Sequence, residues 1–308
     1  MKTLPTIATL WIGDKLSWLE KLSLKSFVDF GHETVLYSYS PIFNAPEGVT
    51  LRDAADVFPG NEIIRHKKNG SPAIHADIWR LHLMQQTEYI WVDADVLCLR
   101  PFDFKEPFVF GLEKPHLVCN AVLRLPADSE TLIKLVDFIS DPYAIGAWLK
   151  PEQQAELQAA KERGAPVHYS EQEWGLTGPA ALSHYLKETG EWRYALPQTA
   201  FYPISFKDRN KMIMSKFNEL VENDMLSPDT YSVHMWARRM KPRLEEAEYN
   251  RPRRGSFMDK ALKRHGIDPK SDPIPPKLKS LPVDQTDKNV EERTAFHGDE
   301  IDAMLRGP

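Results

Sequence analysis

The chain has 308 residues, 42% of them hydrophobic, which is enough for a sizeable core in one large domain or two. Its formal net charge of −5 gives no reason to expect a nucleic-acid partner. No stretch approaches the roughly 20 apolar residues of a membrane-spanning helix, and the N-terminus, MKTLPTIATLWIG, lacks a signal-peptide pattern. Cys98 and Cys119 stand among apolar neighbours, which indicates buried thiols and a cytoplasmic location.

The first third of the chain alternates between strand and helix patterns. Residues 6–13 form a β-branched and apolar run that predicts a strand, and residues 17–20 have the spacing of a capping box that opens a helix. A second strand is expected at 34–39. A helix at 72–86 and a strand at 89–97 then repeat this order. The pattern predicts a parallel sheet with helices on its faces.

The remaining patterns predict shorter elements. They are, in chain order, strands at 108–113 and 117–125, helices at 128–140, 151–163 and 179–188, an extended segment at 193–206, a helix at 211–223, a strand at 231–236 and a helix at 256–265. Helix 151–163 is polar and is expected to be peripheral, as a lid or an insertion. Residues 238–254 are basic and interrupted by prolines. We expect one domain at 1–267 and a disordered or loosely packed tail at 268–308, where few large apolar residues remain.

Two carboxylates, Asp93 and Asp95, directly follow the apolar run at 89–92. Two residues apart in extended backbone, they would point the same way. Because unpaired carboxylates are costly inside a protein, we expect them at the carboxyl end of the strand, where open α/β sheets bind ligands. Two acidic oxygen donors there suit Mg²⁺ or Mn²⁺, although a solvated acidic turn would show the same short pattern.

Two further pairs of residues are spaced so that the members of each pair lie on the same face of a helix or strand. Asp77 and Arg80 are three residues apart on the helix at 72–86; they are either an exposed ion pair or, if the helix packs beside the two carboxylates, a pair that faces the same crevice. His234 and Trp236 are two residues apart on the last strand and therefore lie on the same face. There an imidazole can bind a divalent ion and an indole N–H can donate to a diphosphate. The basic residues that follow either form a solvated face or attract negative charge. That charge would be phosphate groups or, in a peripheral contact, an anionic membrane surface.

Four motifs in order resemble one known group of enzymes. LWIG, AD-x-x-R, YIWVDADVLCLRPF and VHMW resemble the DXD-containing glycosyltransferases, most closely glycosyltransferase family 32 and its distant relatives, the clostridial glucosylating toxins. The resemblance spans residues 5–240 and implies a GT-A fold with a Rossmann-like, mostly parallel sheet. It also implies a metal-dependent, retaining transfer of a hexosyl group from a nucleotide sugar, with a UDP-sugar favoured over GDP-mannose. The acceptor would be a glycan or lipid-linked glycan, as in polysaccharide biosynthesis.

The resemblance assigns the donor-binding roles by motif position. Trp11, beside Ile12, would stack on the nucleotide base, although a tryptophan in a strand could equally be a core residue. Asp77 and Arg80 would contact the donor sugar and ribose. Asn120, at the start of NAVLRLP, would contact the transferred sugar.

The catalytic and metal-binding roles follow from the same resemblance. Asp93 would hydrogen-bond the ribose or sugar, and Asp95 would ligate Mn²⁺ or Mg²⁺ together with His234. Trp236 would reach a phosphate oxygen. A metal that bridges the diphosphate would stabilise the negative charge that develops as the sugar–phosphate bond breaks.

Two alternatives remain from the residues alone. A phosphatase of the haloacid dehalogenase type also places DxD after an apolar strand, but Leu97 stands where that family has Thr or Val, and its late acidic pair finds only Asp299 and Asp302 in the tail. The other alternative is a non-catalytic nucleotide-sugar-binding protein with the same fold.

Overall fold

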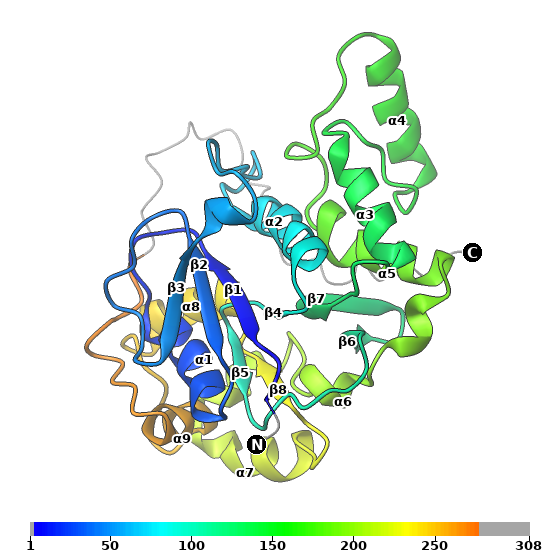
Figure 1. Cartoon of the computed structure of the whole chain (residues 1–308). Helices are drawn as coiled ribbons and strands as arrows, with labels where there is room; N and C mark the ends of the chain where they lie inside the picture. Colours follow the sequence, from blue (N-terminus) through cyan, green and yellow to red (C-terminus); the bar gives the residue numbers. More distant parts are fainter. Residues whose placement is uncertain (1–2, 277–308) are drawn as a thin grey trace.

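The structure, a computed structural model, describes residues 3–276, so the acidic pair at Asp299 and Asp302 lies outside the described residues (Figure 1). At its centre is a six-stranded sheet in the order β3-β2-β1-β4-β7-β6. The strands β3, β2, β1 and β4 are parallel to one another. Strand β7 is antiparallel to both of its neighbours, β4 and β6. The expected α/β class with a mostly parallel sheet is confirmed. The strands are β1 (Ile7–Trp11), β2 (Thr34–Ser38), β3 (Val49–Asp53), β4 (Ile90–Val92), β6 (Val109–Lys114) and β7 (Leu117–Arg124).

The predicted strand at 89–97 is wrong as a single element. The chain turns at Asp93–Asp95, where the Val96 N–H donates to the Asp93 carbonyl at 3.1 Å, and leaves the main sheet. It continues as β5 (Val96–Cys98), which pairs antiparallel with β8 (Ser232–His234) in a second, two-stranded sheet. The turn therefore lies at the carboxyl end of β4, as expected for the carboxylates, but not in extended backbone.

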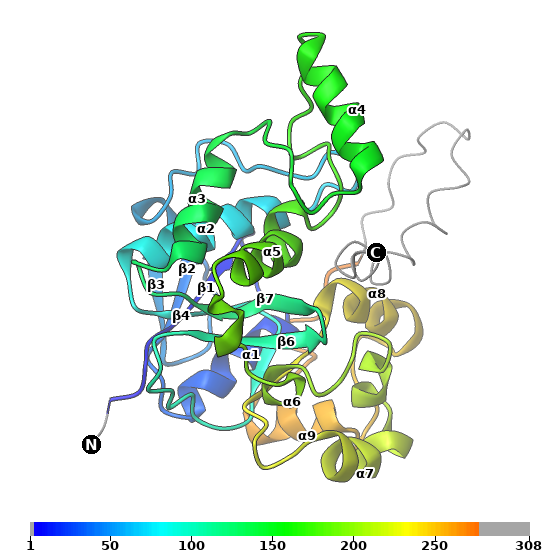
Figure 2. The ribbon, with the colours of Figure 1, turned by 90° about the vertical axis from the view of Figure 1, so that its right-hand side faces the viewer.

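Helices cover both sides of the main sheet (Figures 1 and 2). Helices α2, α3 and α5 pack on one side, and α1, α8 and α9 pack on the other side with β5 and β8. Helix α4 stands away from the body and has no buried residue, which confirms that it is peripheral. The helices are α1 (Trp18–Asp29), α2 (Ala73–Gln86), α3 (Glu130–Ser140), α4 (Pro151–Glu162), α5 (Ala181–Glu188), α6 (Gln198–Phe201), α7 (Asn218–Leu220), α8 (Ala237–Ala247) and α9 (Phe257–Arg264).

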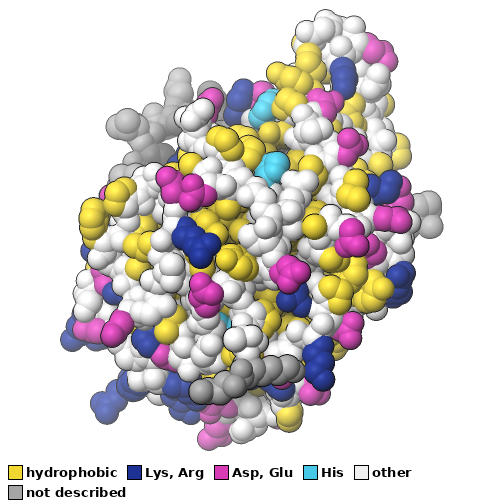
Figure 3. Space-filling view, in the orientation of Figure 1, with side chains coloured by type: hydrophobic (Ala, Val, Ile, Leu, Met, Phe, Trp, Pro, Cys, Tyr) yellow, Lys and Arg dark blue, Asp and Glu magenta, His cyan; other side chains and the backbone are white. Residues whose placement is uncertain are grey.

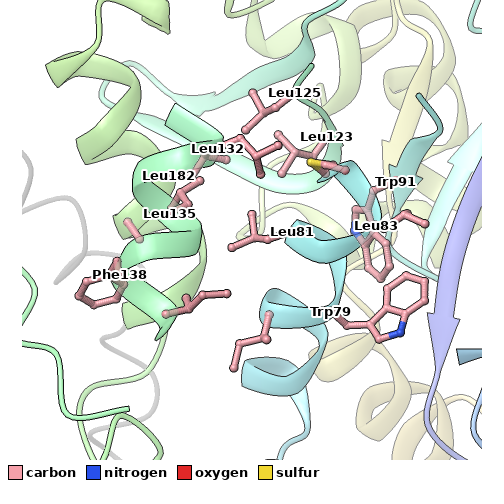
Figure 4. Close-up of a cluster of buried hydrophobic side chains, with 14 of the residues drawn as sticks. Trp79, Leu81, Leu83, Trp91, Leu123, Leu125, Leu132, Leu135, Phe138 and Leu182 are labelled. Atoms are coloured by element: carbon pink, nitrogen blue, oxygen red, sulfur yellow. The ribbon is translucent and has the colours of Figure 1, made fainter. Parts of the chain in front are cut away.

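The larger core fixes α2 against the sheet (Figure 4). Trp79 of α2 packs on Trp91 of β4, with ring centroids 5.8 Å apart. On the other side of the helix, Leu81 points toward Leu135 of α3, and both are buried. Large aromatic and aliphatic groups of this kind contribute most of the burial energy of a core. The same packing holds the polar residues of α2 beside the end of β4.

Residues 238–254, which are basic and interrupted by prolines, include most of helix α8. Pro242 lies inside this helix, although proline removes a backbone donor and disfavours helix interiors. Met240 and Leu244, four residues apart on one face, are both fully buried in the second core. Their burial outweighs the local cost of the proline.

The two cysteines are free and buried, as expected.

Three other differences come from weak local patterns. Residues 193–206 are not extended, because they contain the turn at Glu191–Tyr194 and the short helix α6. The predicted helix at 211–223 is a series of short turns around α7. Strand β3 was not predicted, because it is an exposed edge strand with little apolar sequence. The short 3-10 and π turns are Ala54–Asp56, Leu176–Ala180, Glu191–Tyr194, Arg209–Ile213, Ser215–Phe217 and Val221–Met225.

The segment 268–276, expected to belong to the tail, is packed against the domain. The Asp272 carboxylate lies 2.7 Å from Lys21 Nζ and accepts a hydrogen bond from Asn44 Nδ2 at 2.9 Å. Ile274 is buried in the second core. The packed chain therefore continues past residue 267.

We expect Ile274→Ala to lower the free energy of unfolding by roughly 2 kcal/mol, the lower end for a buried isoleucine, because a chain segment near an end can relax around the cavity. Urea unfolding monitored by circular dichroism measures this. Ile133→Ala is the matched control, since Ile133 is 56% exposed on α3 and should cost less than about 0.5 kcal/mol. Equal stability of the two variants would show that segment 268–276 contributes no packing.

Candidate active site

Asp93, Asp95 and His234 form a cluster at the carboxyl end of β4. The pairing of β5 with β8 places His234 directly opposite Val96 and so beside the turn that carries both carboxylates. One ligand atom from each of the three residues lies within 4.8 Å of the others. The structure therefore brings these three side chains together, and their roles as ligands stay predictions.

Asp95 joins the turn to α8. Its Oδ1 lies 3.2 Å from His234 Nε2, and its Oδ2 accepts the backbone N–H of Ala237, the first residue of α8, at 2.7 Å. Its carbonyl also accepts the Met235 N–H at 2.8 Å. A carboxylate at a helix N-terminus is stabilised by the helix dipole. Asp95 is therefore held in its charged form by an imidazole and a helix end.

The protonation of the cluster follows from burial and charge. Burial raises the pKa of Asp95, but the imidazole of His234 and the Ala237 N–H outweigh it and leave that pKa below its usual value. Burial lowers the pKa of His234, and the Asp95 charge outweighs it, so the net shift is upward. Burial raises the pKa of Asp93, and Arg80 offsets this only in part. The cluster thus holds a carboxylate–imidazolium pair whose proton a metal ion would replace.

The donor set fits a hard divalent cation. Two carboxylates and one imidazole are the ligand types that Mn²⁺ and Mg²⁺ sites use, with imidazole favouring Mn²⁺. The imidazole of His234 also faces the buried thiol of Cys119, and their hydrogen bond adds to the rise in the pKa of His234. The side chain of Asp93 is 30% exposed, so the cluster is open to solvent on one side. These residues could hold one ion that also contacts a ligand from outside.

A buried polar network lies next to this cluster. Arg80 Nη2 is 3.2 Å from Asp77 Oδ1, and its Nη1 is 3.4 Å from Asp93 Oδ1 and donates to the Asn120 carbonyl at 2.6 Å. The guanidinium also lies over the Trp91 ring, 4.5 Å from its centroid. Asp77 and Arg80 are therefore not an exposed pair, and Arg80 connects α2 to Asp93.

The Asp77 carboxylate accepts hydrogen bonds from two other segments of the chain. It accepts hydrogen bonds from Asn120 Nδ2 on β7 and from the Thr177 hydroxyl, each at 2.9 Å. Burial raises its pKa, and the charge of Arg80 offsets this in part. A Cβ on Gly178 would lie 3.0 Å from Asp77 Oδ2, so a larger residue there would require the Asp77 carboxylate to shift. Sequence reasoning did not connect Thr177 or Gly178 with the site, because the contact between Thr177 and Asp77 spans 100 residues.

Trp11 and Ile12 lie at the carboxyl end of β1, and both are half-buried. The indole Nε1 of Trp11 donates to the Lys15 carbonyl at 3.2 Å, which fixes the ring plane. Lys241 Nζ lies over the ring, 5.2 Å from its centroid. The structure brings Trp11 to the correct edge of the sheet, and its role as a base-stacking residue stays a prediction.

Trp236 lies just past β8 in left-handed backbone, with φ of 55°. Its ring packs on His234 with centroids 4.0 Å apart. Its indole N–H donates to the Ile204 carbonyl at 3.1 Å, so in this structure that donor points into the protein. Contact with a phosphate would need a rotation of the side chain, and this role also stays a prediction.

One face of the molecule carries mixed charge. On the face shown in Figure 3, acidic and basic side chains are interspersed over most of the surface, with Lys and Arg gathered at the lower left. Among residues 3–276, no helix has both the length and the apolar composition needed to cross a bilayer. Fold and site together define an α/β protein with a metal-ligand cluster at the carboxyl end of its parallel strands.

Comparisons with known proteins give distant similarities. The chain matches no protein-family model. Subversion of eukaryotic traffic protein A of Legionella pneumophila is 26% identical over 183 residues, which cover 52% of this chain and 28% of that protein. Among solved structures, PaToxG glycosyltransferase aligns with 60% of this chain and 70% of its own at 14% identity and a TM-score of 0.37. The WbbM bifunctional glycosyltransferase aligns with 33% of this chain and 20% of its own, at 12% identity and a TM-score of 0.22.

Proposed function

We propose that the chain is a divalent-metal-dependent glycosyltransferase of the GT-A type that uses a nucleotide sugar. The observation that carries the proposal is the Asp93–Asp95–His234 cluster at the carboxyl end of β4, flanked on one side by Arg80 and Asp77 and on the other by Trp11. A base-stacking ring, a metal site and a polar sugar-binding network are the three parts that a nucleotide sugar needs. Trp11 ends β1, Asp93 and Asp95 follow the neighbouring strand β4, and Asn120 lies on β7, the next strand of the sheet, which supports this proposal.

Different residues bind different parts of the nucleotide sugar in this proposal. Trp11 and Ile12 receive the nucleotide base, and Arg80, Asp77 and Asn120 bind the ribose and the transferred sugar. Because Arg80 already contacts Asp77, Asp93 and the Asn120 carbonyl, its fork of donors is preorganised and loses little freedom on binding. The sugar-binding network is thus formed before the donor arrives.

The metal site acts on the leaving group. Asp95 and His234 would hold Mn²⁺ or Mg²⁺, and Asp93 would orient the donor beside it. Trp236 would reach the diphosphate after its indole N–H leaves the Ile204 carbonyl. When bound, the cation supplies Lewis-acid stabilisation of the negative charge on the departing diphosphate. The partly open side of the cluster admits the donor, and the acceptor is the hydroxyl group of a glycan or lipid-linked glycan. A hexosyl group from a UDP-sugar, transferred with retention, is the first choice, and GDP-mannose the second.

Donor hydrolysis tests this proposal. Purified protein is incubated with UDP-glucose, UDP-galactose and GDP-mannose, with Mn²⁺, with Mg²⁺ and with a chelator, and nucleoside diphosphate release is measured. We expect release with one donor that depends on the metal, and a higher melting temperature with that donor, since a ligand at 100 times its Kd adds about 2.7 kcal/mol. Binding without turnover would favour a nucleotide-sugar-binding protein. Phosphate release from a phosphomonoester would favour a phosphatase.

Trp11→Ala should weaken binding of the matching nucleoside diphosphate by about 1–3 kcal/mol, as for other aromatic rings that stack on bases. Isothermal titration in the presence of Mn²⁺ measures this. Trp192→Ala is a closely matched control, because Trp192 is also a half-buried tryptophan with a lysine over its ring, Lys187 at 4.9 Å. If Trp11→Ala unfolds the protein while nucleotide affinity of the folded fraction stays normal, Trp11 is a core residue.

A further inference from the structure

Lys241 contacts the Trp11 ring from α8, the helix whose first residue binds Asp95. Its Nζ is 5.2 Å from the centroid of the Trp11 ring, at the carboxyl end of β1. Lys241 belongs to α8, one turn after Ala237, whose N–H binds the Asp95 carboxylate. Helical side chains lean toward the helix N-terminus, so the stem of Lys241 leans toward the Asp95 end of α8. Its charge in turn helps to lower the pKa of Asp95.

A buried carboxylate holds the lysine in this place. Nζ of Lys241 lies 2.5 Å from Glu20 Oε1, and the Glu20 side chain is only 2% exposed. The other oxygen of Glu20 accepts the backbone N–H and the hydroxyl of Ser17, at 2.9 and 2.6 Å, as in a capping box. Glu20 is thus fixed to the start of α1, whereas Lys241 reaches it through a flexible four-carbon stem and is 21% exposed.

A nucleoside diphosphate that spans this edge must pass Lys241. With the base on Trp11 and the diphosphate near Asp95, the phosphates lie between these two residues, where the ammonium group already stands. An ammonium group is a common phosphate ligand, and a phosphate is a stronger partner for it than the face of a ring. An ammonium group has three donors, so Nζ can turn from the Trp11 ring toward the phosphates and keep one hydrogen bond to the buried Glu20 carboxylate.

We propose that Lys241 is a donor-binding residue that contacts the diphosphate on the side away from the metal and that Glu20 holds it over Trp11 until a nucleotide binds. This inference rests on the proposed function and adds a residue to it. The neighbouring Arg238 is not equivalent, because its guanidinium lies over the Trp174 ring, 3.9 Å from the centroid. The contacts of Lys241 join Trp11 to the α1 cap.

The test separates the diphosphate from the nucleoside. Titration calorimetry with Mn²⁺ compares UDP, UMP and uridine, or the guanosine series, on wild type and on Lys241→Met. Loss of one charged hydrogen bond to phosphate predicts about 10- to 100-fold weaker diphosphate binding. Nucleoside affinity should change by less than about 3-fold, and affinity for Mn²⁺ alone should not fall, because the variant removes a positive charge near Asp95. Lys21→Met is the matched control: Lys21 adjoins Glu20, is 20% exposed and pairs with Asp272.

A double variant separates phosphate binding from neutralisation of Glu20. Glu20→Gln keeps an acceptor for Ser17 and removes the negative charge. The double variant Glu20→Gln with Lys241→Met therefore leaves no buried charge unpaired. It can still be measured if Lys241→Met alone does not fold. Weak diphosphate binding by the double variant supports the inference, and restored binding overturns it. An equal loss for uridine and UDP also overturns it, because Lys241 would then act only on Trp11. If wild type binds no nucleoside diphosphate, the proposed function fails and takes this inference with it.

Discussion

Asp95→Asn is expected to lower Mn²⁺ affinity and metal-dependent donor hydrolysis together, by about 100-fold or more. The variant keeps the size of the side chain and the acceptor for the Ala237 N–H, so the fold should persist. It removes the charge that a hard cation needs and the counter-charge of His234. Changing groups that merely orient metal ligands already costs about 10- to 100-fold, so loss of a charged ligand should exceed that.

Donor hydrolysis as a function of Mn²⁺ concentration measures both quantities in one experiment. Asp103→Asn is the control, since Asp103 is an exposed aspartate a few residues further along the chain and should behave as wild type. Asp93→Asn should retain more of the metal affinity, because its proposed role is to bind donor hydroxyls and an amide oxygen still accepts. Full activity of Asp95→Asn would remove the metal from the mechanism and with it the glycosyltransferase proposal.

Arg80→Met is expected to have the largest effect on stability, a loss of about 3–5 kcal/mol. Arg80 is 5% exposed and is the cation that contacts both Asp77 and Asp93, so its removal leaves buried negative charge uncompensated. The methionine keeps most of the stem that lies along the core, so the loss reports on charge and hydrogen bonding more than on volume. Chemical denaturation at neutral pH measures the change.

Two further variants make the result specific. Arg52→Met should cost less than about 1 kcal/mol, because the Arg52 side chain is 41% exposed and its nearest carboxylate, on Glu33, is 4.0 Å away. Arg80→Met combined with Asp77→Leu should be more stable than Arg80→Met alone, since one unpaired buried charge is removed with its partner. If the double variant is no better, the cost of losing Arg80 arises from packing against Trp91 and not from its charge.

Local patterns in the sequence determined much of the framework. The apolar runs of β1, β2 and β4, and the capping box of α1, depend on neighbours a few residues apart, and the structure has each of them close to its expected place. The pairing of Asp77 with Arg80 is also local, since residues three apart on a helix always meet. The position of Asp93 and Asp95 at the end of a buried strand follows from the cost of burying carboxylates.

Only the tertiary structure decided how these parts form a site. The chain turns between Asp93 and Asp95 because β5 pairs with β8, more than 130 residues later in the chain. Thr177 completes the Asp77 network from a distant segment, and α8 forms despite Pro242 because Met240 and Leu244 are buried. These outcomes depend on contacts between segments far apart in the chain, and propensity or periodicity within one segment carries no information about such contacts. The sequence by itself therefore determined which residues could bind a metal and a nucleotide, and the long-range packing decided which of them meet.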